Sequence, residues 1–130
     1  MFRTLTDRIL VSPQISVEQV AEAKAQGVTM IVNNRPDDEE PGQINGAEIE
    51  AAALKAGIDY VAVPVAHGGF APWQLDGMAQ ALDQTGDGKM LAYCRSGTRS
   101  TLLWALTRAR AGDHPDVLAA QAAAAGYDIS

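Results

Sequence analysis

The sequence is poor in thiol and imidazole groups, with a single cysteine, Cys94, and two histidines, His67 and His114. One cysteine cannot form a disulfide within the chain, which is compatible with a reducing compartment. One thiol and two widely separated histidines also lack the ligand spacing of a metal site. We therefore expect the protein to use neither a metal nor another cofactor.

Long apolar runs are missing as well. No stretch approaches the roughly 18 apolar residues of a membrane-spanning helix, and residues 1–7 lack the apolar segment of a signal peptide. The formal net charge is −6, which disfavours binding to nucleic acid or to an anionic membrane. These absences predict a cytoplasmic protein of bacterial type without nucleic-acid or membrane partners, and they leave its oligomeric state open.

Apolar strand-like runs alternate with helical patterns along the chain. With 130 residues, 47% of them hydrophobic, the chain is long enough to bury one core, and we expect one domain over residues 1–130. The alternation predicts an α/β fold with a mainly parallel sheet and helices on both faces. The expected strands are 7–13, 28–32, 58–63 and 89–93, and the expected helices are 17–25, 44–56, 72–84, 99–111 and 115–125.

The last expected strand leads directly into the sequence Cys-Arg-Ser-Gly-Thr-Arg-Ser at residues 94–100. Sites in parallel sheets form at the carboxyl ends of the strands. There the amides of residues 95–99 can surround an anion, and a helix that begins near Thr98 adds its positive dipole end. A thiol beside Arg95 and Arg99 is expected to be partly ionised at neutral pH. The pattern therefore predicts a nucleophilic Cys94 whose bound anion is stabilised by Arg99.

Other candidate residues lie on neighbouring loops. His67 is a candidate proton donor or a plain loop histidine. Arg35 offers a second cation at the site, or a salt bridge to the carboxylates of residues 37–40. Ser100 offers a hydrogen bond to the Cys94 sulfur or a local helix cap. The remaining predicted anion-binding residues are Arg95, Ser96, Gly97 and Thr98.

Four segments of the chain resemble the phosphatase-like domain of the beta-lactamase-hydrolase-like proteins, a bacterial group. They are residues 31–37, 60–65, 93–100 and 103–105, and the resemblance covers nearly the whole chain. More distantly the chain is similar to the dual-specificity phosphatases. The resemblance implies a cysteine-phosphatase-like fold, with a central sheet of four to five strands flanked by helices.

The sequence departs from the phosphatase pattern at two points. Only four residues separate Cys94 from Arg99, whereas phosphatases place five there, and the resulting Cys-x-x-Gly-x-Arg pattern is similar to the loop of many rhodanese-type sulfurtransferases. Dual-specificity phosphatases also carry a catalytic aspartate just after the strand that corresponds to residues 60–65. His67 stands there in this chain, and Asp37 and Asp38 are alternative acids.

Three functions follow from these observations. We expect sulfur transfer first: Cys94 takes sulfur from a small sulfane donor as a persulfide and passes it to an acceptor thiol, without needing a proton donor. The alternative is hydrolysis of a small anionic phosphoester through a phosphocysteine, with Arg99 clamping phosphate oxygens. The third is a non-enzymatic thiol redox or anion sensor.

Overall fold

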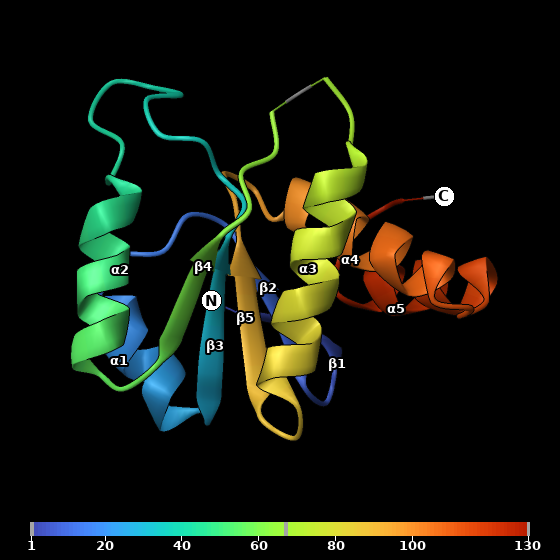
Figure 1. Cartoon of the computed structure of the whole chain (residues 1–130), viewed down its shortest axis with the longest axis horizontal. Coiled ribbons are helices and arrows are strands. Elements are labelled where there is room, and N and C mark those ends of the chain that lie inside the picture. The colour runs from blue at the N-terminus through green and yellow to red at the C-terminus, as the bar shows by residue number, and fades with distance from the viewer. Residues whose placement is uncertain (1, 67, 130) are drawn as a thin grey trace.

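The protein folds as a single sheet covered by helices on both faces, in a computed structural model that describes residues 2–66 and 68–129 (Figure 1). Within these residues five strands pair in the order β1-β2-β5-β3-β4. The strands are β1 (Arg3–Thr6), β2 (Ile9–Ser12), β3 (Val28–Asn33), β4 (Asp59–Ala62) and β5 (Lys89–Tyr93). The helices are α1 (Val17–Ala25), α2 (Gly46–Lys55), α3 (Pro72–Thr85), α4 (Thr98–Arg110) and α5 (Pro115–Ala124). The predicted α/β class is confirmed.

The sheet is parallel except at one edge. Strands β2, β5, β3 and β4 run parallel, while β1 pairs antiparallel with β2. The single strand predicted over residues 7–13 was therefore wrong at its start, because the chain forms a hairpin there. The Thr6 hydroxyl accepts hydrogen bonds from the backbone N–H groups of Arg8 and Ile9, both at 3.2 Å, and so stabilises the turn. Strand β1 escaped prediction because Leu5 is its one buried residue.

The ends of the helices follow local capping chemistry. A capping box begins α1 at Ser16: its hydroxyl accepts from the Gln19 N–H at 3.2 Å, and its N–H donates to Gln19 Oε1 at 2.8 Å. Helix α2 starts at Gly46 rather than at residue 44, because the Asn45 side chain accepts from the Ala47 N–H at 2.9 Å.

Among the described residues, no helix has the length and apolar character needed to cross a membrane.

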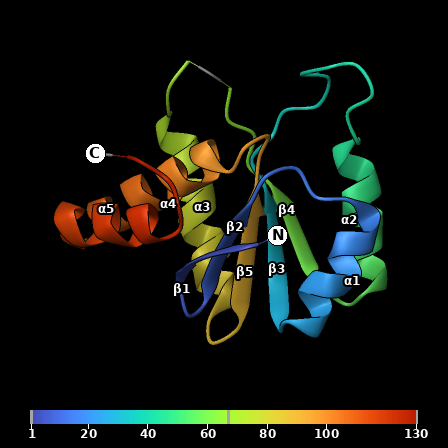
Figure 2. The same cartoon turned by 180° about the vertical axis from the view of Figure 1, so that it is seen from behind.

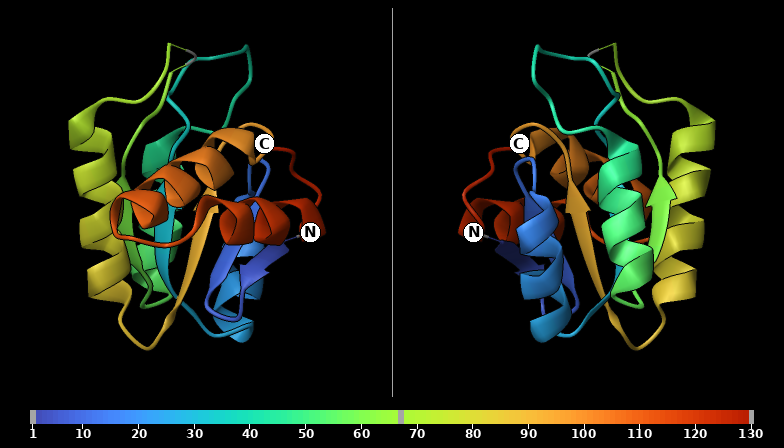
Figure 3. Two further views of the ribbon diagram at one scale, coloured as in Figure 1. Left: turned by 90° about the vertical axis from the view of Figure 1, so that its right-hand side faces the viewer. Right: turned by 90° about the vertical axis from the view of Figure 1, so that its left-hand side faces the viewer.

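Two hydrophobic cores lie on opposite faces of the sheet. Helices α1 and α2 cover one face, and α3, α4 and α5 lie on the other (Figures 2 and 3). The central strand β5 supplies both cores, since Met90 and Ala92 pack on the α3 side and Leu91 and Tyr93 on the α1 side. This double burial explains why β5 reads as a continuous apolar run.

The carboxyl ends of the parallel strands meet at one edge of the sheet, where the longer loops rise (Figure 1). The backbone N–H of Cys94 donates to the Ser12 carbonyl at 3.4 Å, which joins the ends of β5 and β2. The N–H of Asn34 donates to the Tyr93 carbonyl at 2.8 Å, which joins the ends of β3 and β5. The fold thus fixes the start of the cysteine loop from both sides.

Candidate functional site

Cys94 opens a short turn between β5 and α4. Its side chain is fully buried, and its sulfur accepts a hydrogen bond from the Gly97 N–H at 3.1 Å. Gly97 has a φ of 96°, a left-handed conformation that glycine adopts without strain. The turn therefore brings a backbone donor directly onto the sulfur, where it can stabilise negative charge.

The hydroxyl residues of this turn bond to each other. Ser96 Oγ accepts from the Thr98 N–H at 3.3 Å and lies 3.1 Å from Thr98 Oγ1. These bonds link Ser96 to Thr98, the first residue of α4. The first turn of α4 presents the positive end of the helix dipole. Arg95, by contrast, is exposed, and its Nη2 lies 3.7 Å from Glu40 Oε2.

Arg99 is held on one side by two acceptor groups, the Glu39 carboxylate and the Val65 carbonyl. Its Nη1 donates to Glu39 Oε2 at 2.7 Å and to the Val65 carbonyl at 2.6 Å, and its Nη2 donates to Glu39 Oε1 at 2.8 Å. The residue is 8% exposed. Its Nε–H has no hydrogen-bond partner within residues 2–66 and 68–129. Within the described residues the guanidinium is thus fixed in place with two of its five N–H donors left over, the Nε–H and one Nη2–H.

Charge at the site is set by the Glu39–Arg99 pair. The hydrogen bond from Arg99 lowers the pKa of Glu39 to about 2, with a smaller contribution from Arg35 and partial burial acting against both. The same hydrogen bond raises the pKa of Arg99 above its ordinary value. At neutral pH Glu39 is therefore a carboxylate that cannot donate a proton, and Arg99 is a cation.

Arg35 forms the salt bridges that the sequence offered as one of its two interpretations. Its side chain is buried, and Nε donates to Glu39 Oε1 at 2.9 Å while Nη2 donates to Glu40 Oε1 at 2.8 Å. The third nitrogen, Nη1, donates to Gln14 Oε1 at 3.1 Å. Arg35 therefore supports the carboxylate that holds Arg99, and its own guanidinium lies against these acceptors.

An open pocket of about 680 Å³ lies over the cysteine turn. Four predicted residues line it together, and Phe70 and Leu102 provide an apolar wall. No described residue in this lining carries a carboxyl group. The lining residues are Val65, Ala66, Gly69, Phe70, Arg95, Ser96, Thr98, Arg99 and Leu102.

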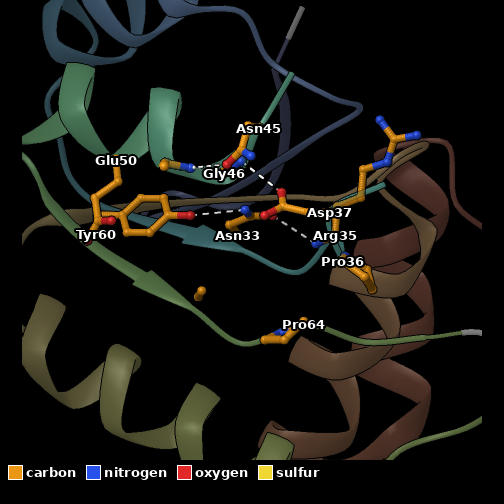
Figure 4. A pocket seen from close by; sticks show the side chains of 11 residues that line it. Asn33, Arg35, Pro36, Asp37, Asn45, Gly46, Glu50, Tyr60 and Pro64 are labelled. Carbon is orange, nitrogen blue, oxygen red and sulfur yellow. Dashed lines mark hydrogen bonds between the residues drawn. The ribbon is translucent and has the colours of Figure 1, made fainter. Parts of the chain in front are cut away.

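The candidate acids lie elsewhere. Asp37 faces a separate pocket of about 470 Å³ beside α2, where its Oδ1 accepts from the Gly46 N–H at 2.8 Å (Figure 4). Asp38 is exposed and adopts a left-handed φ of 63°. Neither lines the pocket over the cysteine turn. His67 lies outside the described residues, so its role stays a prediction.

Ser100 and Asn34 connect the helix to the sheet. The Ser100 hydroxyl donates its one proton to Asn34 Oδ1 at 2.8 Å rather than to the Cys94 sulfur. The Asn34 amide donates to the Val63 carbonyl at 2.9 Å, and the residue is fully buried. Asn34 therefore joins β3, the segment after β4 and α4 beneath the site.

Two residues of the site were not identified from the sequence. Asn34 has a detectable signal, because a polar amide directly after a buried apolar strand of a parallel sheet lies at the functional edge. Glu39 appeared only as a possible partner of Arg35. Its bond to Arg99 spans 60 residues of sequence, and no local pattern indicates such a contact.

Comparison with known proteins identifies the family. Over residues 1–111 the chain matches the family described as "Beta-lactamase hydrolase-like protein, phosphatase-like domain". It is 32% identical over 126 residues to the beta-lactamase hydrolase-like protein of Xylella fastidiosa and 32% identical over 108 residues to that of Agrobacterium fabrum. These matches cover 96% and 83% of this chain, but 29% and 25% of the relatives. The chain thus spans less than a third of the length of these curated relatives.

Solved structures agree on the fold. A candidate phosphatase from Neisseria meningitidis is 30% identical with a TM-score of 0.83, and the match covers 98% of this chain and 90% of the other. Kinase associated phosphatase, solved with serine at its catalytic cysteine, is 14% identical with a TM-score of 0.78, covering 99% and 85%. The predicted cysteine-phosphatase-like fold is therefore confirmed. The chain belongs to the family of phosphatase-like domains found in beta-lactamase hydrolase-like proteins.

Proposed function

We propose that this chain hydrolyses phosphate esters through a phosphocysteine on Cys94. The observation that carries the proposal is the fixed guanidinium of Arg99, which Glu39 and the Val65 carbonyl hold at the rim of the cysteine turn. A cation held in place before the substrate arrives loses little conformational freedom on binding phosphate oxygens. The family match and the similarity to the Neisseria meningitidis protein support the same chemistry.

The reaction takes place in two displacements at phosphorus. The Cys94 thiolate attacks phosphorus in line, so that an S–P bond forms while the P–O bond to the leaving group breaks. The amides of the turn and Arg99 stabilise the charge on the phosphate oxygens. Water then attacks the phosphocysteine, the S–P bond breaks, and inorganic phosphate and the thiolate are released.

The leaving group sets a preference among substrates. No described residue in the pocket lining carries a carboxylic acid, and Glu39 is ionised at neutral pH. An alkoxide needs a proton as it leaves, whereas a phenolate needs it far less. We therefore expect hydrolysis of alkyl phosphates to depend on His67, the predicted proton donor, and hydrolysis of aryl phosphates to proceed without it.

Sulfur transfer is the second candidate, favoured by the short turn of four residues between Cys94 and Arg99. In this reaction the Cys94 thiolate attacks the outer sulfur of a sulfane donor such as thiosulfate. An S–S bond forms on Cys94 as the donor's S–S bond breaks, and the donor leaves as an anion without a proton. An acceptor thiolate or cyanide then removes the outer sulfur and restores the Cys94 thiolate.

One pair of assays distinguishes the two candidates. Wild type and Cys94→Ser are tested for hydrolysis of an aryl phosphate and for thiocyanate formation from thiosulfate and cyanide. Phosphate release that disappears in Cys94→Ser supports the phosphatase proposal. Thiocyanate formation without phosphate release replaces it with sulfur transfer, and activity that persists in Cys94→Ser removes Cys94 from both.

A further inference from the structure

The C-terminal segment contacts the cysteine turn through Tyr127. The Tyr127 hydroxyl donates to the Ser96 carbonyl at 3.0 Å, across 31 residues of sequence. Tyr127 is 8% exposed, so its ring is packed inside the molecule. The family match ends at residue 111, and the contact therefore comes from a part of the chain that the family description does not cover.

The end of α5 directs Tyr127 to this position. Gly126 has a left-handed φ of 95° and its N–H donates to the Ala123 carbonyl at 2.9 Å. The Tyr127 N–H donates to the Ala122 carbonyl, also at 2.9 Å. These two bonds form a Schellman motif, which ends the helix and reverses the chain. The reversal brings the tyrosine back over the start of α4.

Strand β1 holds the same segment from the other side. The Arg3 guanidinium lies 5.4 Å from the centre of the Tyr127 ring, within the range of a cation–π interaction. Arg3 Nη1 also donates to the Ala125 carbonyl at 3.0 Å. The ring of Tyr127 is thus fixed independently of its hydroxyl group, and the hydroxyl can be removed without releasing the ring.

The two hydrogen bonds at the turn lie at opposite ends of one peptide group. The Ser96 carbonyl accepts from Tyr127, while the N–H of the same peptide, from Gly97, donates to the Cys94 sulfur at 3.1 Å. In a trans peptide the C=O and N–H point in opposite directions. A flip of this peptide would turn the carbonyl oxygen toward the sulfur, and glycine at position 97 makes such a flip sterically possible.

We propose that Tyr127 is a positioning residue, which holds the Ser96–Gly97 peptide so that the Gly97 N–H faces the Cys94 sulfur. The role rests on the cysteine chemistry proposed above, because it keeps a donor rather than an acceptor beside the reacting anion. Gly97 fits the same interpretation. A Cβ at this position would overlap the Tyr127 hydroxyl oxygen and lie 2.7 Å from Tyr127 Cζ, so the missing side chain lets the tyrosine approach.

The test compares Tyr127→Phe with Tyr60→Phe. The first variant removes only the oxygen that contacts Ser96. The second removes a hydroxyl that accepts from Asn33 Nδ2 at 3.0 Å, in the separate pocket beside α2 (Figure 4). Both variants keep Arg99 and its hydrogen bonds to Glu39 and the Val65 carbonyl.

Two measurements report directly on the hydrogen bond between the Gly97 N–H and the Cys94 sulfur. The first is the pH profile of Cys94 alkylation by iodoacetamide, which is specific because the chain has one cysteine. Loss of one hydrogen-bond constraint is expected to move the midpoint in Tyr127→Phe to higher pH, and to lower the alkylation rate at pH 7, relative to its own plateau at high pH, by about threefold. The second is the Gly97 amide proton resonance, which is expected to move upfield. Tyr60→Phe is expected to leave both unchanged.

A second variant, Arg3→Ala, keeps the hydroxyl but removes the support of its ring. It is expected to move the alkylation midpoint in the same direction by a smaller amount. A midpoint that stays unchanged or moves lower in Tyr127→Phe, together with an unchanged Gly97 amide, overturns the proposal and leaves Tyr127 a packing residue. Because neither readout needs a substrate, this outcome is distinguishable from a failure to hydrolyse aryl phosphates.

Discussion

At the scale of single residues, the site depends on a carboxylate that does no proton transfer. Glu39 receives hydrogen bonds from both Arg99 and Arg35, and these bonds keep it ionised at neutral pH. Its role in this account is to place the Arg99 guanidinium at the turn. The nucleophile and its cation therefore come from the sequence 94–100, while the group that orients the cation comes from the loop after β3.

The first residue-scale prediction concerns acid stability of Glu39→Gln. The pKa of Glu39 is about 2 in the fold and has an ordinary value of 4.5. Ionised Glu39 therefore stabilises the fold above pH 4.5, and this stabilisation is lost as the pH falls toward 2. We expect Glu39→Gln to lower the free energy of unfolding by about 2 kcal/mol at pH 7, allowing for partial solvent screening.

Urea unfolding between pH 7 and pH 3 measures this difference. The difference in unfolding free energy between wild type and Glu39→Gln is expected to become smaller below pH 4.5. Glu22→Gln, on the exposed surface of α1, serves as the control and should unfold with almost the same free energy as wild type. If the difference between wild type and Glu39→Gln stays constant from pH 7 to pH 3, ionised Glu39 does not stabilise the fold.

The second residue-scale prediction concerns Arg99→Ala. If Arg99 clamps phosphate in the transition state, its removal should lower kcat/KM for an aryl phosphate by a factor of roughly 100 or more. Thiocyanate formation should fall less, because a sulfane sulfur needs less charge stabilisation. The control is Arg110→Ala, which removes an exposed arginine of the same helix paired with Asp76. Equal losses in both reactions would remove the phosphate clamp from the account.

At the scale of elements, the site is built by three strand ends and the start of one helix. Asn34 is the residue that connects them, since its side chain bonds to the Val63 carbonyl and to the Ser100 hydroxyl, and its N–H bonds to the Tyr93 carbonyl. All of these groups are buried beneath the turn. The geometry of Cys94 and Arg99 therefore depends on a hydrogen-bonded layer that does not itself touch the pocket.

The hydrogen bonds of Asn34 lead to a prediction about the stability of the fold. Asn34→Ala removes two side-chain hydrogen bonds and leaves buried polar partners unsatisfied, so it is expected to cost about 3 kcal/mol of unfolding free energy. Asn45→Ala removes only the cap of α2 and is expected to cost about 1 kcal/mol. Urea unfolding of the two variants checks the order. Equal costs would show that Asn34 is no more important than an ordinary helix cap.

At the scale of the whole molecule, the order of strands and helices was predictable because each element carries its own local pattern. The cysteine turn was predictable for the same reason, since strand, cysteine, glycine and arginine follow one another within a few residues. Strand β1 was not, because it is short and buries only Leu5. Chain folding alone places Glu39 against Arg99 and Tyr127 against Ser96, and a sequence pattern cannot show such distant contacts.

Hydrolysis by the proposed route requires Cys94 to become phosphorylated during turnover. The most direct measurement is mass spectrometry of wild type and Cys94→Ser, quenched in acid within milliseconds of mixing with an aryl phosphate. A phosphate adduct that maps to Cys94 is expected in wild type and is expected to be missing from Cys94→Ser. Phosphate release by the wild type without any adduct on Cys94 at any quench time would contradict this route.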